Sequence, residues 1–172
     1  MEKISEKDLI LAGEEDLEEV LALCHDVARR TPSSQWGEDY PNRAILSRDI
    51  QVRSLYKVVR EGKIVSIMQI RPWEDFQKGE EAPDTARWDP AIRKPCALGR
   101  FCVSPDCQGQ GLGRQVMAAT LKKAGTMGYD GAFFHVVMGN EIAVGLYESM
   151  GFRRAGEIHE YGLDFYCYEM KL

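Results

Sequence analysis

Apolar residues along the chain follow two different spacings, which predict a mixture of helices and strands. From residue 14 to residue 30 they recur every three or four positions, the spacing that places side chains on one face of a helix. Residues 42–52 predict a second, shorter helix. Short apolar runs that end in turn-forming residues predict strands instead. These runs cover residues 9–12, 54–59, 64–70, 96–103, 132–138, 152–160 and 163–171.

Glycine and asparagine mark where several of these elements begin and end. Residues 112–127 predict a helix that Gly128 closes in the left-handed conformation. Asn140 predicts the N-cap of a further helix that ends at Gly151. Residues 73–94 are polar and predict a long loop, which in a compact domain is usually functional or disordered.

A glycine-rich turn lies between the strand run 96–103 and the helix run 112–127. Residues 108–113 read Gln-Gly-Gln-Gly-Leu-Gly. The first N–H groups of a helix have no acceptor inside the helix, and the helix dipole adds partial positive charge there. The turn therefore predicts a seat for a phosphate or pyrophosphate. The simpler alternative is that the glycines only make a tight turn.

The glycine spacing differs from those of two nucleotide-binding motifs. Gly109, Gly111 and Gly113 form G-x-G-x-G, whereas the dinucleotide fold requires G-x-G-x-x-G. Gly113 is followed by Arg114-Gln115, and a P-loop requires Lys and then Ser or Thr. Neither motif fits this chain.

Two runs resemble the signatures of the GNAT N-acetyltransferases, a family that binds acetyl-coenzyme A. Gln108-x-x-Gly111-x-Gly113, preceded by Val103-Ser104-Pro105, resembles the first signature. The second signature, N-x-x-A-x-x-L-Y-x-x-x-G-F, is matched by Asn140, Ala143, Leu146, Tyr147, Gly151 and Phe152. Nearer the start, Gln35-Trp36 with Tyr40-Pro41 resembles a Q-W-x-x-x-Y-P element of some small bacterial members.

The resemblance implies a fold of the α/β (α+β) class. It implies one domain over residues 1–172, with a central mixed, mostly antiparallel sheet of about seven strands flanked by about four helices. The strand before the glycine turn and the strand after its helix would run parallel and then splay apart.

The resemblance also implies acetyl-CoA as the cosubstrate, with no metal. Main-chain groups of Phe101, Cys102 and Val103 would line the pantetheine arm. The amides of the glycine turn would hold the pyrophosphate; this turn consists of Gln108, Gly109, Gln110, Gly111, Leu112, Gly113 and Arg114. At Gly111 and Gly113 a Cβ would block the approach of the phosphate. Arg114 is alternatively a solvated helix arginine. Asn140 and Ala143 would contact the coenzyme arm, and Asn140 has a second interpretation as a helix cap.

By the same resemblance, Tyr147 is the general acid that protonates the leaving thiolate. A phenol with a pKa near 10 can serve as an acid at neutral pH. The alternative is that Tyr147 only packs in the core. No carboxylate occupies residues 97–101, where some family members carry a glutamate base. The candidates elsewhere are His135, Glu38, Asp39, Glu74 and Asp75, and ordered water could serve instead.

The acceptor is expected to be a primary amine of a small molecule or peptide, bound by the variable segments 35–41 and 73–94 and by the closing hairpin. Trp36, Tyr40 and Trp73 are aromatic residues in these segments that could wall a pocket. Arg100 could meet an acceptor carboxylate, or could form a salt bridge at the edge of the core. Nearby acidic residues would suit a cationic amine.

Composition narrows the class of protein. The net charge of −5 argues against general nucleic-acid binding, which usually shows a basic footprint. No apolar stretch approaches the roughly 20 residues that span a bilayer, so we expect no membrane association and a cytoplasmic location. The five cysteines form no C-x-x-C pair and predict reduced thiols, of which Cys107 could be reactive beside the helix start. A homodimer is left open, as is a non-catalytic acyl-CoA sensor on the same fold.

Overall fold

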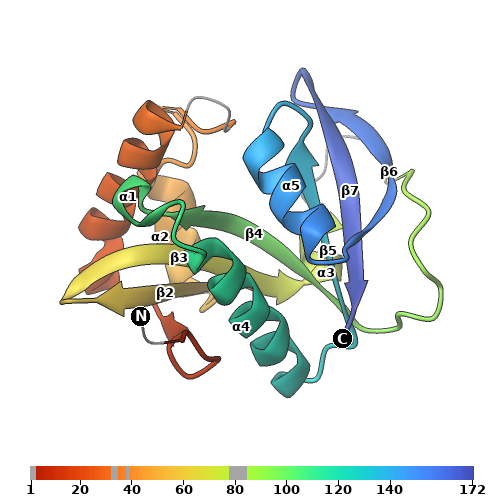
Figure 1. Cartoon of the computed structure of the whole chain (residues 1–172), viewed down its shortest axis with the longest axis horizontal. Helices are drawn as coiled ribbons and strands as arrows, with labels where there is room; N and C mark the ends of the chain where they lie inside the picture. Colours follow the sequence, from red (N-terminus) through yellow and green to blue (C-terminus); the bar gives the residue numbers. More distant parts are fainter. Residues whose placement is uncertain (1–2, 32–34, 38, 78–84) are drawn as a thin grey trace.

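The computed structural model describes residues 3–31, 35–37, 39–77 and 85–172 (Figure 1). Within these residues one seven-stranded sheet runs in the order β1-β2-β3-β4-β5-β7-β6. All neighbouring strands are antiparallel except the parallel pair β4 and β5. The strands are β1 Ile10–Leu11, β2 Leu55–Arg60, β3 Lys63–Pro72, β4 Pro95–Val103, β5 Gly131–Val137, β6 Arg153–Glu160 and β7 Leu163–Lys171.

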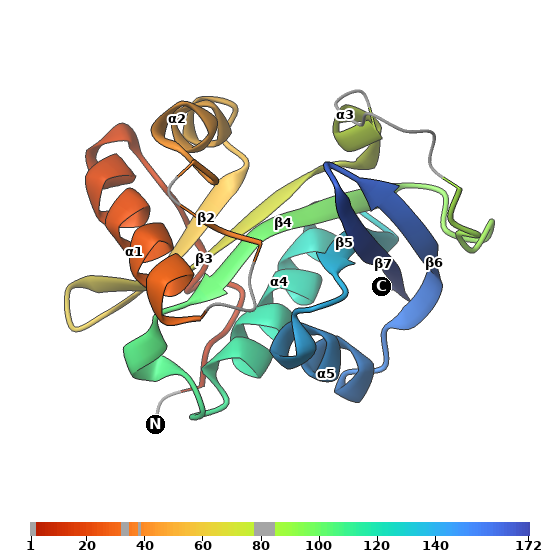
Figure 2. The same cartoon turned by 90° about the horizontal axis from the view of Figure 1, so that it is seen from above.

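Helices cover both faces of the sheet, as Figure 2 shows. They are α1 Leu17–Arg30, α2 Arg43–Gln51, α3 Trp73–Gln77, α4 Leu112–Thr126 and α5 Glu141–Ser149. Side chains alternate along each strand, so Ile67 packs with α1 and α2 while Met68 packs with α4 on the opposite face. The predicted fold class is therefore confirmed.

Several predicted helix ends are confirmed in detail. The side chain of Asn140 accepts a hydrogen bond from the N–H of Ala143 at 3.1 Å, which is an N-cap. Gly128 and Gly151 have φ values of 91° and 87°, so each ends its helix in the left-handed region. A 3₁₀ turn at Glu14–Asp16 precedes α1, which begins later than the pattern predicts.

The prediction of a loop over residues 73–94 is wrong for its first five residues, which form α3. Trp73 is only 6% exposed, and its ring lies 4.8 Å from that of Phe76 and 5.3 Å from that of Phe133. Because this burial depends on a strand far along the chain, the local pattern does not reveal the helix. Further on, Arg87 N–H donates to Ala155 O at 2.9 Å, so this segment lies along β6.

Strands β4 and β5 are paired only over their first residues. The register is Pro95 with Gly131, Cys96 with Ala132 and Ala97 with Phe133, although the strands continue to Val103 and Val137. In Figures 1 and 2 the two strands run apart after this pairing. The predicted splayed parallel pair is therefore confirmed.

Candidate active site

The glycine turn fills the space between the end of β4 and the start of α4. A 3₁₀ turn at Pro105–Cys107 leads into it, and α4 begins at Leu112. Gly109 and Gly111 have φ values of 73° and 75°, and Gly111 is the N-cap of α4. Left-handed backbone costs a residue with a Cβ roughly 1–2 kcal/mol, so glycine is favoured at both positions.

Most main-chain N–H groups in this turn have no hydrogen-bond acceptor among the described residues. Within the described residues, the N–H groups of residues 109–114 donate no hydrogen bond, and the first amide to do so is Gln115, to Gly111 O at 3.2 Å. A run of free amides at the positive end of a helix is the arrangement that binds phosphate. The geometry thus meets the requirements of the predicted anion seat.

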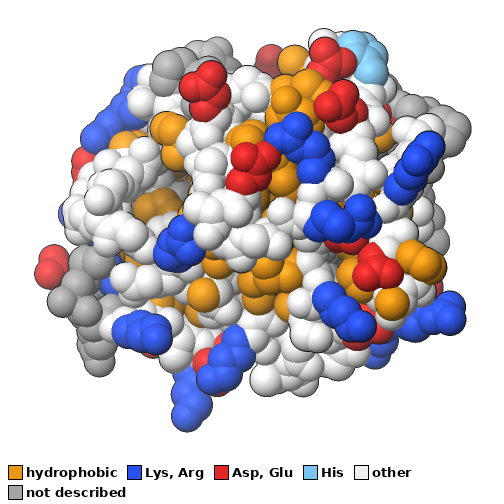
Figure 3. Space-filling model, turned by 45° about the vertical axis from the view of Figure 1, so that its right-hand side comes forward, with side chains coloured by type: hydrophobic (Ala, Val, Ile, Leu, Met, Phe, Trp, Pro, Cys, Tyr) orange, Lys and Arg blue, Asp and Glu red, His pale blue; other side chains and the backbone are white. Residues whose placement is uncertain are grey.

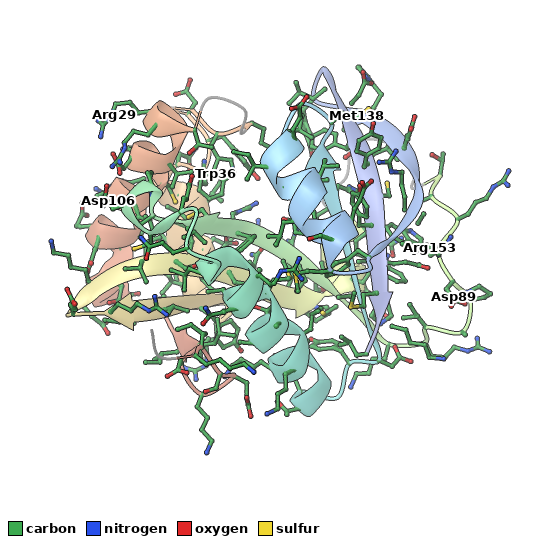
Figure 4. The ribbon with its side chains drawn as sticks, in the orientation of Figure 1. Arg29, Trp36, Asp89, Asp106, Met138 and Arg153 are labelled. Atoms are coloured by element: carbon green, nitrogen blue, oxygen red, sulfur yellow. The ribbon has the colours of Figure 1, made fainter. Side chains whose placement is uncertain are left out.

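Gln108 fastens this turn to β4 through its side chain. Its Nε2 donates to Val103 O at 3.1 Å, in the strand whose main chain is expected to line the coenzyme arm. Asp106, which Figure 4 labels, anchors the other side of the turn, because its carboxylate pairs with Arg30 of α1 at 2.8 Å. Sequence reasoning gave only the main chain of Gln108 a role.

Gly113 lies where the two sequence signatures meet. A Cβ built there would lie 3.7–3.8 Å from side-chain atoms of Leu146 on α5 and of Phe101 and Val103 on β4. These are ordinary van der Waals distances, so any requirement for glycine here would come from a ligand. Arg114 is exposed and donates to Ser149 Oγ at 2.5 Å, which joins α4 to the end of α5.

Tyr147 projects from α5 into an aromatic group. Its ring centroid lies 4.5 Å from that of Phe134, 5.7 Å from Phe152 and 5.9 Å from Tyr168. The residue is 6% exposed, and its hydroxyl makes no hydrogen bond within the described residues. Burial, followed by the nearby Tyr168, raises the pKa of Tyr147 above its ordinary value of 10.0.

The remaining residues of the two signatures are placed as follows. Asn140 is a helix cap, which is one of the two roles predicted for it. Ala143 is partly buried against the core that contains Tyr147. Cys102 faces the other side of the sheet and packs beside Cys24, where burial raises the pKa of its thiol well above the ordinary value. The five cysteines are all free, and the described residues contain no group able to hold a metal.

Arg100 forms the salt bridge that was one of its two interpretations. Its Nε lies 3.0 Å from Asp49 Oδ2, and its Nη1 donates to Tyr40 Oη at 2.6 Å. Tyr40 and Trp36 belong to the segment between α1 and α2, where Figure 4 labels Trp36. Trp36 packs partly buried against α1 and α2.

His135 and Trp73 occupy a cluster on the same face of the sheet as α1 and α2. His135 lies 5.7 Å from Trp73 and 5.1 Å from Phe76, ring to ring. Because neighbouring residues on β5 face opposite sides, His135 points away from the side that holds Tyr147. Asp39, Glu74 and Asp75 are exposed, and Glu38 lies outside the described residues. The catalytic and binding roles of these residues stay predictions.

A family model described as the acetyltransferase (GNAT) family matches residues 20–152. The chain belongs to this family. A GNAT acetyltransferase structure from Streptococcus agalactiae 2603 superposes with a TM-score of 0.76 at 16% identity, covering 95% of this chain and 94% of that one. A GNAT structure from Streptococcus pneumoniae gives 0.68 at 20% identity, covering 95% and 98%.

A third similar structure is the ribosomal-protein-S18-alanine N-acetyltransferase from Escherichia coli, with a TM-score of 0.67 at 18% identity and coverage of 95% and 92%. At these identities the structures establish the shared fold. A search of curated proteins found no match.

Two cavities of this GNAT domain lie away from the glycine turn. One, of about 380 Å³, is lined by residues that include Trp73, Lys94 and Tyr129, and adjoins Pro95, where β4 is still paired with β5. The other, of about 420 Å³, lies beside Arg153 and Glu169. Neither is lined by Tyr147 or by the amides of residues 109–114.

Asp49, the ion-pair partner of Arg100, is a residue that sequence reasoning missed. It lies in the predicted helix 42–52, next to Ile50 and three residues after Leu46, both of which are buried. An acidic residue on the apolar face of a helix is the one signal that could have drawn attention to it. Nothing local in the sequence identifies Arg100 as its partner, since the two are 51 positions apart.

Proposed function

We propose that this chain is an N-acetyltransferase that moves an acetyl group from acetyl-CoA to a primary amine of a small molecule or peptide. The observation that carries the proposal is the run of free amides at residues 109–114, beside the point where β4 has left β5. A diphosphate would satisfy those amides. The main chain of Phe101, Cys102 and Val103, which has no partner on β5, would line the arm.

When bound, acetyl-CoA supplies an activated thioester. Tyr147 Oη then donates its proton to the sulfur as the thiolate leaves. The raised pKa keeps the phenol protonated at neutral pH, although it makes the phenol a weaker acid. A free thiol has a pKa of about 8.5. Donation therefore accompanies the growth of charge on the sulfur and does not precede it.

The acceptor amine would reach the thioester from the face that holds Trp36, Tyr40 and Arg100, opposite the side of Tyr147. The E. coli structure is named for an alanine of a ribosomal protein, which is one amine of the proposed class. His135, on the acceptor face, or an ordered water would take the amine proton. None of the helices among the described residues has the length and apolar character to cross a bilayer. A cytoplasmic location and a homodimer stay predictions.

Calorimetry with coenzyme A and acetyl-CoA, followed by a thiol-release assay over a panel of amines, tests the proposal. Binding of both forms and turnover with at least one amine support an acetyltransferase. Binding without turnover over a broad panel would favour the sensor. A protein that binds neither form would contradict both functions.

A further inference from the structure

A group of buried polar side chains lies behind the acceptor face, outside the two sequence signatures. Asp49, Ser54 and Gln69 are 6%, 4% and 1% exposed. Gln69 Nε2 donates to Asp49 Oδ1 at 2.7 Å and to Ser54 Oγ at 3.1 Å. Arg100 Nε donates to the second carboxylate oxygen, Oδ2, at 3.0 Å. Each oxygen of the buried carboxylate therefore has its own donor.

This group is attached to an irregularity in β4. The pairing of β3 with β4 shifts between Ile67 and Gln69, because β4 carries one extra residue there. Arg100 lies in this bulge with a φ of 51°, a conformation that side-chain-bearing residues rarely adopt. Such strain persists only where the surroundings fix it, and here the fixing contact is the carboxylate of Asp49.

Gly99 and Gln69 complete the fit on the other side of the bulge. A Cβ on residue 99 would lie 2.9 Å from Gln69 Oε1, too close for a real contact. The glycine therefore makes room for the amide that holds Asp49. The bulge, the amide and the carboxylate form one interlocked unit.

The same arginine also contacts Tyr40, a residue of the proposed acceptor face. Its Nη1 donates to Tyr40 Oη at 2.6 Å, and its guanidinium carbon lies 5.3 Å from the centroid of the Tyr40 ring. Arg100 thus connects α2, the bulge of β4 and the segment that carries Trp36. Its side chain is 17% exposed, so these contacts are largely shielded from water.

We propose that Asp49 and Arg100 are positioning residues that set two parts of the site at once. The Asp49–Arg100 pair holds the bulge that turns β4 away from β5. The Arg100–Tyr40 hydrogen bond holds Tyr40, on the proposed acceptor face, against that bulge. This proposal rests on the proposed acetyltransfer for its consequences in turnover. Its structural content can be tested without turnover.

Two variants separate the effect on the bulge of β4 from the effect on the position of Tyr40. Arg100→Lys keeps the charge but loses the planar fork that reaches Asp49 and Tyr40 together. We expect faster hydrogen exchange in peptides covering residues 39–42 and 98–103, and coenzyme A affinity lower by about tenfold or more, because small misplacements of binding groups are costly. Tyr40→Phe removes one hydroxyl. Its faster exchange should be confined to residues 39–42, with coenzyme A affinity unchanged and a raised KM for any accepted amine.

The matched control is Arg43→Gln, which removes another arginine of the α2 region, paired at the surface with Glu18. This variant should match the wild type in both measurements. The proposal is overturned if Arg100→Lys leaves exchange over residues 98–103 unchanged, or if Tyr40→Phe weakens coenzyme A binding as much as Arg100→Lys. If the wild type binds no coenzyme A, the proposed function fails, while the exchange pattern still decides the positioning role.

Discussion

The glycine turn follows the end of β4, whereas the proposed acceptor face is built on α2, β3 and the bulge of β4, and the two regions are built in different ways. The glycine turn offers main-chain amides, which left-handed glycines and the start of α4 leave free. The acceptor face depends on side chains that come from α2, β3 and β4 and meet at the buried carboxylate of Asp49. On the face of the molecule drawn in Figure 3, acidic and basic side chains are interspersed. Backbone chemistry is encoded locally in the chain, whereas a side-chain network exists only after folding.

The largest expected effect is on the side-chain network. Asp49→Ala leaves Arg100 largely buried without its counter-ion, and breaking a buried pair in this way costs about 3–5 kcal/mol. Chemical denaturation should show this loss of unfolding free energy. Asp26→Ala is the control, because Asp26 pairs with arginines at the exposed end of α1, and we expect little change. Equal stabilities of the two variants would remove the distinction between network and surface pairs.

Tyr147→Phe sharpens the comparison from the coenzyme side. The ring still packs on Phe134 and the core is kept, but the sulfur loses its proton donor. Removing a general acid typically costs about 100-fold or more in rate. Steady-state kinetics should show a lower kcat with coenzyme affinity, measured by calorimetry, almost unchanged. An unaltered kcat would leave Tyr147 with a packing role alone.

Gly111→Ala should weaken coenzyme A binding by about tenfold, because the free turn of the variant relaxes out of the left-handed conformation, and restoring it on binding costs a residue with a Cβ about 1–2 kcal/mol. Space is not the reason, since nothing lies within 4 Å of a Cβ built there. Gly125→Ala, in the last turn of α4 and equally unobstructed, is the control; it should leave coenzyme A affinity unchanged and add at most about 0.5–1 kcal/mol of stability, the value for a helix interior. Calorimetry and thermal unfolding of both variants measure the two effects. Identical coenzyme affinities would show that the loop conformation does not depend on glycine.

A smaller effect concerns pH. Burial raises the pKa of Tyr147 in the folded state above the ordinary 10.0. The unfolded chain loses this proton first, so the stability from Tyr147 is complete below pH 10 and is lost as pH rises toward the folded pKa. Between pH 8 and pH 11 the wild type should lose about 1.4 kcal/mol more stability than Tyr147→Phe, because both proteins keep the other tyrosines with raised pKa values. Denaturation of both proteins at the two pH values measures the difference. Parallel pH profiles would mean that this phenol titrates normally.

Much of the fold follows from local patterns in the sequence. Each of the strands starts or ends within a few residues of its predicted run, and Asn140, Gly128 and Gly151 act as the predicted caps. Helix α3 could not be predicted from local patterns, because Trp73 packs against Phe133, a residue of the distant strand β5. The glycine turn could be placed because its chemistry needs only consecutive residues.

The acceptor face could be predicted only in part. Arg100 and Tyr40 were recognised as candidates from their segments, but the bond between them needs the folded chain. Asp49 and Gln69 are ordinary polar residues in a helix and a strand, and no local signal assigns either one a partner. A buried network is a property of the three-dimensional arrangement, so sequence spacing cannot specify it.

The segment that lies along β6 has a consequence for assembly. Arg87 N–H donates a hydrogen bond to the carbonyl oxygen of Ala155. Ala86 lies so close to Gly156 that a Cβ on residue 156 would be 3.2 Å from the Cα of Ala86. An edge strand with open hydrogen-bonding groups is a template for strand addition by another molecule. At the opposite edge β1 is only two residues long. Continuous sheets shared between copies, and fibres grown from them, are therefore disfavoured at both margins of this fold.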